Sequence, residues 1–234
     1  MISVIAFDAD DTLWHTENLF QQTQVRLAAI LERYAPHDEV MDRLQRTERR
    51  NLVIFGYGIK GFILSMVETA IEITERRVTA AEIHEIMMMG KAMLDAPLDL
   101  LDGVAAVLVE LATRYRLFLI TKGDMLDQRN KIDKSGLADR FTHVEIVPEK
   151  NTTIYRAIFT ARGVEPAEVV MVGNSIPSDI LPVLEIGGRA VHIPYHVTAE
   201  FERHRDLPQH PGFHQLTGIA ELPALIARLD PSNE

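Results

Sequence analysis

The chain has 234 residues, enough for one large domain or two small ones, and its 47% hydrophobic and 25% charged content is that of an ordinary soluble globular protein. Its net charge of -10 argues against general nucleic-acid binding, because that function needs a basic face. The absence of cysteine excludes disulfides, thiolate metal sites and a thiol nucleophile, so a covalent nucleophile must be oxygen or nitrogen.

The first predicted element is a buried strand over Val4–Phe7, which runs directly into two acids, Asp8 and Asp10. Residues two apart in an extended segment point to the same side, so we expect the two carboxylates to face one point. Like charges this close raise each other's pKa unless a cation lies between them, and Mg²⁺ is the usual choice. The alternative is a solvated acidic turn in which Thr12 caps the next helix.

The segment from Asn18 to Leu94 has helical periodicity and no strong strand pattern. A capping box, Thr79-Ala80-Ala81-Glu82, precedes the last of its helices. Four helices with short connections predict an antiparallel bundle. The predicted helices are Gln21–Tyr34, Glu39–Arg50, Lys60–Glu75 and Ala80–Leu94.

After Pro97, helices and strands alternate, and repeated units of this kind predict a parallel sheet with helices on both faces. The run from His196 to His214 is expected to be a loop over the sheet edge. The predicted helices are Gly103–Arg114, Met125–Ser135, Thr152–Arg162, Asp179–Ile186 and Ile219–Leu229. The predicted strands are Arg116–Ile120, His143–Val147, Val169–Val172 and Ala190–Ile193.

These elements predict an α/β fold, a three-layer Rossmann-like parallel sheet core with an inserted α-helical bundle. The core is expected to comprise residues 1–16 and 97–234, and the helical insert residues 17–96. An insert after the first strand is expected over the carboxyl ends of the strands, where open α/β sheets bind ligands.

Four successive predicted strands each end in chemically useful polar residues. Solvated turns would also be polar, but they would not preferentially supply an acid pair, a hydroxyl with nearby amides, a lysine and a further oxygen pair. In strand order these residues are Asp8 and Asp10; Thr121, Lys122 and Gly123; Glu149 and Lys150; Asn174, Ser175 and Asp179.

In these motifs the chain resembles a haloacid dehalogenase-superfamily hydrolase, of the phosphatase branch with a helical C1-type cap between the first and second motifs. The resemblance covers essentially the whole chain, and its strength lies in four motifs that occur in order, each after a strand. The matching positions are Asp8-x-Asp10-x-Thr12, Thr121, Lys150 and Gly173-Asn174-x-x-x-x-Asp179.

The resemblance implies a role for each catalytic position. Asp8 would attack phosphorus and form an aspartyl phosphate, and Asp10 would protonate the leaving oxygen and then activate water. Thr121 would bind a phosphoryl oxygen, helped by the amide of Lys122 or Gly123. Lys150 would neutralise both the nucleophile and the phosphate. The alternatives are a helix cap for Thr121 and a solvated side chain for Lys150.

The implied cofactor is Mg²⁺, held by the Asp8 carboxylate, the Asp10 backbone carbonyl and an oxygen of Asn174 or Asp179. The alternative is that Asn174 and Asp179 are turn and cap residues. Asn174 stands where the family usually has Asp, and weaker metal affinity is therefore predicted. Asp11 stands where Gly is frequent, which costs little because Asp tolerates tight backbone conformations.

The predicted function is therefore a Mg²⁺-dependent phosphatase for a small phosphorylated metabolite, with nucleotides, flavin phosphates and sugar phosphates all open. The presence of Asp10 favours phosphate-ester hydrolysis over carbon–halogen cleavage, because the resemblance implies that dehalogenases lack this acid. The alternatives are a sugar-phosphate mutase of the same superfamily and a non-catalytic ligand-binding protein.

A rival motif lies in the helical segment, where Gly56-Tyr57-Gly58-Ile59-Lys60-Gly61 fits the dinucleotide pattern G-x-G-x-x-G of an oxidoreductase. That pattern needs a surrounding strand–helix–strand unit, and the flanks here are predicted to be helical. A cap loop in which Phe55, Tyr57 and Lys60 contact the substrate is an alternative, as is a plain helix–helix turn.

No membrane segment or export signal is predicted. The longest apolar stretches, such as residues 104–109, are too short to span a bilayer, and Asp8 comes too early for a signal peptide. The expected location is cytoplasmic.

Overall fold

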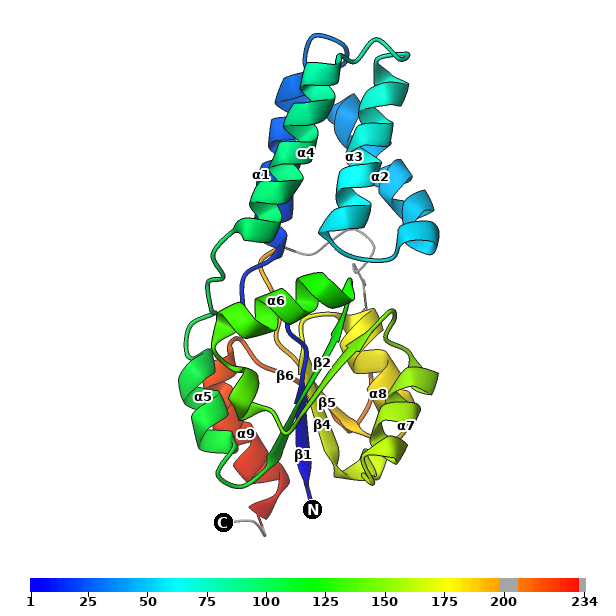
Figure 1. Cartoon of the computed structure of the whole chain (residues 1–234). Helices are drawn as coiled ribbons and strands as arrows, with labels where there is room; N and C mark the ends of the chain where they lie inside the picture. The colour runs from blue at the N-terminus through cyan, green and yellow to red at the C-terminus, as the bar shows by residue number, and fades with distance from the viewer. Residues whose placement is uncertain (198–205, 232–234) are drawn as a thin grey trace. The chain divides into compact units, whose positions relative to one another are not determined.

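The core is built on one six-stranded sheet, seen in a computed structural model that describes residues 1–197 and 206–231 (Figure 1). Every strand pairs in parallel with its neighbours. The strands in spatial order are β3 (His143–Val147), β2 (Arg116–Lys122), β1 (Val4–Phe7), β4 (Val169–Gly173), β5 (Arg189–His192) and β6 (Phe213–Gln215).

The first strand of the chain lies in the middle of this sheet. β1 pairs with β2 on one side and with β4 on the other, so the strand order reverses at β1. Ligands of open α/β sheets bind outside the carboxyl ends of the strands at such a switch point. Asp8, the residue directly after β1, therefore lies at the position where this architecture binds ligands.

Successive residues of β1 pack on opposite faces of the sheet, which explains why the strand is an unbroken apolar run. Ile5 and Phe7 join a buried cluster with helices α5 (Val104–Leu111) and α9 (Leu222–Leu229). Val4 and Ala6 join a second cluster with α7 (Thr152–Ala161) and with Val183 of α8 (Leu181–Glu185). The three-layer parallel architecture predicted from the sequence is thereby confirmed.

Strand β6 corrects one prediction, because it lies at the end of the run from His196 to His214 that is expected to be a loop. Its Phe213 pairs with Ala190 and its Gln215 with His192. A three-residue edge strand with one apolar side chain has no pattern that a sequence reading detects. Residues 198–205 of that predicted loop lie outside the described residues.

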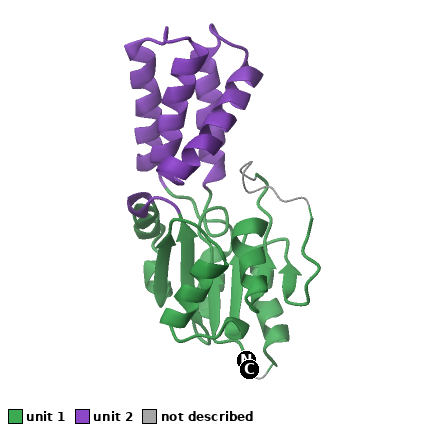
Figure 2. Ribbon diagram, turned by 90° about the vertical axis from the view of Figure 1, so that its right-hand side faces the viewer, with its two compact units in different colours: residues 1–15, 98–122, 128–234 green, residues 16–97, 123–127 purple. Residues whose placement is uncertain are grey.

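The chain forms two compact units, coloured separately in Figure 2. The core unit comprises Met1–His15, Leu98–Lys122 and Gln128–Glu234, and the helical unit comprises Thr16–Pro97 and Gly123–Asp127. The sequence predicts residues 123–127 as part of the core, but they group with the helical unit. Within that unit, Lys60 Nζ donates to Asp124 Oδ1 over 2.9 Å.

The helical unit has its own apolar core, to which all four of its helices contribute, through residues such as Leu27, Leu44, Met66 and Ile86. The predicted capping box is present, with Thr79 Oγ1 accepting from the amide of Glu82. None of the helices in the described part of the chain is long and apolar enough to cross a membrane. The helices are α1 (Glu17–Leu31), α2 (His37–Phe55), α3 (Ile59–Ile73) and α4 (Ala80–Asp95).

The glycine-rich segment connects two of these helices and has no strand before it. Helix α2 ends at Phe55 and α3 begins at Ile59. Gly56 and Gly58 have φ values of 70° and 115°, a region in which residues other than glycine are strained. The dinucleotide-binding alternative is therefore wrong, because its strand–helix–strand unit is missing here.

One acid of helix α2 makes the stability of the protein depend on pH. Burial raises the pKa of Glu48 to about 7. A carboxyl group with a raised folded-state pKa loses stability as pH rises from its unfolded value towards its folded one. We therefore expect the free energy of unfolding to fall between about pH 4.5 and pH 7, by at most about 3 kcal/mol.

The substitution Glu48→Gln removes this titration and should flatten the pH dependence of stability, measured by urea unfolding at pH 5 and pH 8. Glu39→Gln provides the matched control, since Glu39 lies exposed on the same helix. An unchanged pH dependence in the Glu48 variant would contradict the expectation.

Candidate active site

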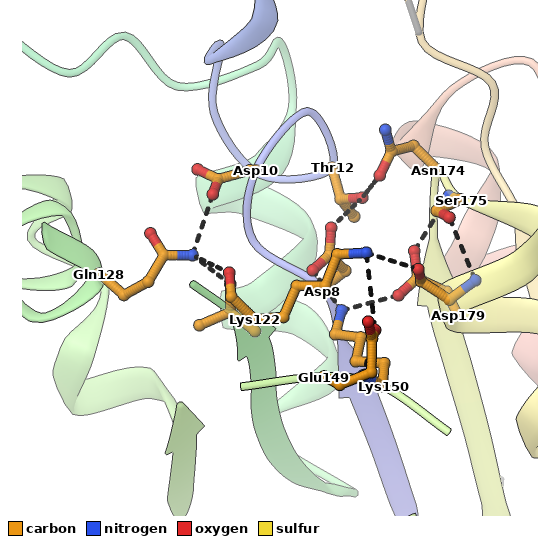
Figure 3. Close-up of polar contacts among 12 residues, drawn as sticks. Asp8, Asp10, Thr12, Lys122, Gln128, Glu149, Lys150, Asn174, Ser175 and Asp179 are labelled. Carbon is orange, nitrogen blue, oxygen red and sulfur yellow. Dashed lines mark hydrogen bonds and ion pairs between the residues drawn. The ribbon is translucent and has the colours of Figure 1, made fainter. Parts of the chain in front are cut away.

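Lys150 lies between two buried carboxylates at the carboxyl end of the sheet (Figure 3). Its Nζ contacts Asp8 Oδ1 and donates to Asp179 Oδ1 over 2.7 Å. Asp8, Lys150 and Asp179 are 7%, 4% and 0% exposed. Because buried charges are stable only when they are paired, the single ammonium is the counter-charge that both acids share.

Burial and charge pairing act in opposite directions on these groups. Burial raises the pKa of Asp8 to about 7, although the positive charge of Lys150 opposes this rise. Burial alone would lower the pKa of Lys150, but Asp179 and Asp8 outweigh it and hold that pKa well above its usual value. Lys150 is thus a cation at neutral pH, and a second cation beside Asp8 would favour the ionised form that a nucleophile requires.

The sheet and the turn after β4 fix the two acids. The amide of Asp8 donates to Val172 O of β4 over 2.9 Å, which continues the pairing of β1. The amide of Ser175 donates to Asp179 Oδ2 over 3.0 Å. A Cβ atom on Gly173 would lie 2.2 Å from Asp179 Oδ2, so only glycine permits this approach. Both oxygens of Asp179, a predicted metal ligand, are therefore engaged by other groups.

This turn also changes a predicted boundary. The sequence predicts a helix over Asp179–Ile186, whereas α8 begins at Leu181 after a π-helical turn over Ile176–Ile180. Asp179 thus belongs to the turn, where its amide donates to Ser175 O over 2.8 Å.

Oxygen atoms from three residues converge beside Asp8, in a set that fits a hard divalent cation. One terminal atom of the Asn174 amide lies 3.3 Å from Asp8 Oδ2, from the Asp10 carbonyl oxygen and from Thr12 Oγ1. If the NH₂ group of Asn174 occupies this position, it donates to the three oxygens. If the amide oxygen occupies it, Asp8, Asp10 and Asn174 present a carboxylate, a backbone carbonyl and an amide oxygen, which are ligand types that Mg²⁺ takes.

The convergence includes only one carboxylate. Residues 1–197 and 206–231 contain no group of three His, Cys, Asp or Glu side chains that could hold a metal. A cation beside Asp8 would therefore depend on the backbone oxygen of Asp10 and the amide oxygen of Asn174. Thr12 contacts Asp8 Oδ2 over 3.4 Å, and helix α1 has Thr16 at its N-cap, so Thr12 does not cap that helix.

The carboxylate of Asp10 is held by a separate group of donors. Lys131 Nζ lies 2.7 and 2.8 Å from its two oxygens. Trp14 Nε1 donates to Oδ1 over 2.8 Å. Figure 3 shows the contact of Gln128, whose Nε2 donates to Oδ2 over 2.9 Å. Four contacts from three side chains therefore fix the orientation of this carboxylate.

This arrangement corrects the expectation that the Asp8 and Asp10 carboxylates face one point. Strand β1 ends at Phe7, so the alternation of an extended chain does not continue to Asp10. Asp11 has a φ of 60°, which bends the chain directly after Asp10. The carbonyl oxygen of Asp10 consequently faces the Asn174 amide, while its carboxylate meets Lys131.

The residues predicted to bind phosphate lie at the carboxyl end of β2, where Thr121 and Lys122 are the last two residues of the strand. Thr121 is 1% exposed, and its Oγ1 lies 2.6 Å from Gln128 Nε2. Lys122 Nζ donates to Ser178 Oγ over 2.7 Å and lies 3.9 Å from Glu149 Oε1. Gly123 follows with a φ of 143° and groups with the helical unit.

The predicted substrate contacts Phe55, Tyr57 and Lys60 belong to the helical unit. Lys60 pairs with Asp124 of the same unit. Phe55 is 48% exposed. A contact between these side chains and a substrate stays a prediction.

Sequence reasoning missed Trp14, Gln128 and Lys131. The signal for the last two was available, because residues three apart on helix α6 (Met125–Ser135) share one face of the helix. What the sequence could not supply was the target of that face, which depends on where Asp10 points.

Comparison with known proteins identifies relatives along nearly the whole chain. A family model described as haloacid dehalogenase-like hydrolase matches residues 2–187. Human N-acylneuraminate-9-phosphatase is 24% identical over 98% of this chain and 95% of its own length. Glyceraldehyde 3-phosphate phosphatase of Pyrococcus furiosus is 25% identical over 99% of this chain and 95% of its own length.

Solved structures give the same picture of the fold. A haloacid dehalogenase-like family hydrolase from Xanthomonas campestris is 38% identical, with a TM-score of 0.89 over 99% of this chain and 93% of that one. A 2-haloacid dehalogenase from Pseudomonas syringae pv. tomato DC3000 is 18% identical, with a TM-score of 0.67 over 98% of this chain and 100% of that one. The second likeness shows a shared fold only.

The substitution Asn174→Asp tests the oxygen cluster beside Asp8. It adds a full negative charge to that cluster, so Mg²⁺ should bind about tenfold more tightly, as measured by isothermal titration calorimetry. Asn130→Asp, an exposed position on α6, adds the same charge elsewhere and should leave the affinity unchanged. Equal affinities in the wild type and the Asn174 variant would show that this amide does not face the cation.

Proposed function

Because this chain belongs to the haloacid dehalogenase-like hydrolase family, we propose that it is a Mg²⁺-dependent phosphatase acting on a small phosphorylated metabolite. The observation that carries the proposal is the position of Asp8, buried at the switch point of the sheet between Lys150 and the oxygen cluster. Relatives along nearly the whole chain are phosphatases, which agrees with this reaction type.

In the first step, a carboxylate oxygen of Asp8 attacks phosphorus and forms an aspartyl phosphate while the bond from phosphorus to the ester oxygen breaks. Lys150 neutralises charge on Asp8 and on the phosphoryl oxygens. Thr121 and the adjacent backbone amide donate to the phosphoryl group. Asp10 protonates the departing oxygen, which leaves as a hydroxyl group.

In the second step, a water molecule attacks the aspartyl phosphate, and the bond between phosphorus and the Asp8 oxygen breaks. Asp10, now ionised, takes the proton of that water. The products are inorganic phosphate and a free Asp8 carboxylate, so the enzyme is ready for another turnover.

Asp8, the Asp10 carbonyl and Asn174 would hold the cation. When bound, Mg²⁺ supplies positive charge that stabilises the phosphoryl group in the transition state. Asp179 serves this arrangement indirectly, because it fixes Lys150 next to the nucleophile.

The substrate class that we favour is a phosphate ester of a small carbohydrate. The two named relatives act on N-acylneuraminate 9-phosphate and glyceraldehyde 3-phosphate. Nucleotides and flavin phosphates form the comparison classes in a substrate panel. Higher activity on either class than on sugar phosphates would replace this assignment without affecting the reaction type.

The substitution Asp8→Asn should abolish turnover, because a neutral amide is a poor nucleophile towards phosphorus. The measurement is Mg²⁺-dependent release of phosphate from p-nitrophenyl phosphate, and we expect a loss of at least about a thousandfold. Asp139→Asn removes an exposed acid of the same unit and should retain full activity.

Two outcomes would contradict the proposal in different ways. Equal rates in the wild type and the Asp8 variant would exclude Asp8 as the nucleophile. Absence of turnover in both, across the substrate panel, would favour a ligand-binding protein over an enzyme.

A further inference from the structure

Two donors on one face of helix α6 meet the carboxylate of Asp10. Lys131 reaches both of its oxygens, at 2.7 and 2.8 Å, and Gln128 reaches Oδ2 at 2.9 Å. They lie three positions apart, the spacing that places side chains on the same face of a helix. Ile132 of the same helix packs in the apolar core of the sheet, which fixes where this face points.

Gln128 also links Asp10 to the predicted phosphate site. Its Nε2 lies 2.6 Å from Thr121 Oγ1 and 2.9 Å from the carbonyl oxygen of Lys122. The residue is 1% exposed, and its Oε1 has no hydrogen-bond partner among the described residues. A buried amide that leaves its own oxygen unsatisfied pays a free-energy cost, which points to a functional placement of its nitrogen.

We propose that Lys131 and Gln128 are positioning residues for Asp10, which hold its carboxylate in the orientation needed to protonate the leaving oxygen. The inference rests on the proposed phosphatase function, in which Asp10 is the acid. Asp10 lies beyond the end of β1 with its side chain 26% exposed, so the sheet does not fix its rotamer. A proton donor must lie within hydrogen-bonding distance of the oxygen that leaves, and side-chain rotation would remove it from that position.

The test uses two esters that differ in how much they need an acid. The aryl oxygen of p-nitrophenyl phosphate leaves readily without a proton, whereas the alkoxide of glycerol 3-phosphate requires one. Lys131→Met should lower kcat/KM for glycerol 3-phosphate by at least about tenfold more than for p-nitrophenyl phosphate. Gln128→Leu should act in the same direction, and Lys131→Arg should recover part of the loss, because it restores a cationic donor.

Two controls separate positioning from a general effect on the fold. Lys134→Met removes an exposed cation from the same helix and should leave both rates unchanged. In an Asp10→Asn background, Lys131→Met should cause no further selective loss, since residues that act as a unit are not additive.

Equal losses for the two esters, or a faster Lys131 variant, would overturn the positioning role while the phosphatase proposal stands. A wild-type protein that hydrolyses neither of these esters, nor any member of the substrate panel with Mg²⁺ present, would overturn the proposed function, and the positioning role with it.

Discussion

The site depends on the ion pairs that Lys150 makes with Asp8 and Asp179. Two carboxylates, one directly after β1 and one in the turn that follows β4, lie buried against this one ammonium group. Removing the ammonium would leave buried carboxylates without a counter-charge, at a cost of roughly 3–5 kcal/mol. Lys150 therefore links the fold to the proposed chemistry, because the contacts beside the proposed nucleophile also hold the residue after β1 and the turn after β4 together.

The two acids around Lys150 differ in whether they have a carboxylate oxygen available to a ligand. Asp179 gives one oxygen to Lys150 and the other to the backbone of Ser175. Asp8 gives one oxygen to Lys150 and turns the other towards Asn174 and the Asp10 carbonyl. Of the two acids, Asp8 therefore has an oxygen directed to the ligand position and Asp179 does not. The proposed metal binding consequently depends in part on neutral oxygens, those of the Asp10 carbonyl and the Asn174 amide.

Local patterns predicted the fold and most residues of the candidate site, whereas features that depend on distant geometry were missed. The apolar run of β1 and the polar residues at the carboxyl ends of β2, β3 and β4 are visible in sequence because strand and site are adjacent along the chain. The direction of the Asp10 carboxylate depends on a turn at Asp11 that binary patterns do not encode. The role of Lys131 depends in turn on that direction, and so it could not be anticipated.

The central place of β1 has a consequence for how the chain is made. During synthesis the strand emerges before its partners, because these begin only at Arg116 and Val169. Residues 16–97 have their own apolar core and local helices, so they are expected to fold while β1 still has two open edges. An apolar strand with both edges exposed is prone to pair with other chains. The segment that leads to Asp8 is thus synthesised before its partners and completed late, which makes the newly made chain vulnerable to aggregation at the strand that precedes the proposed nucleophile.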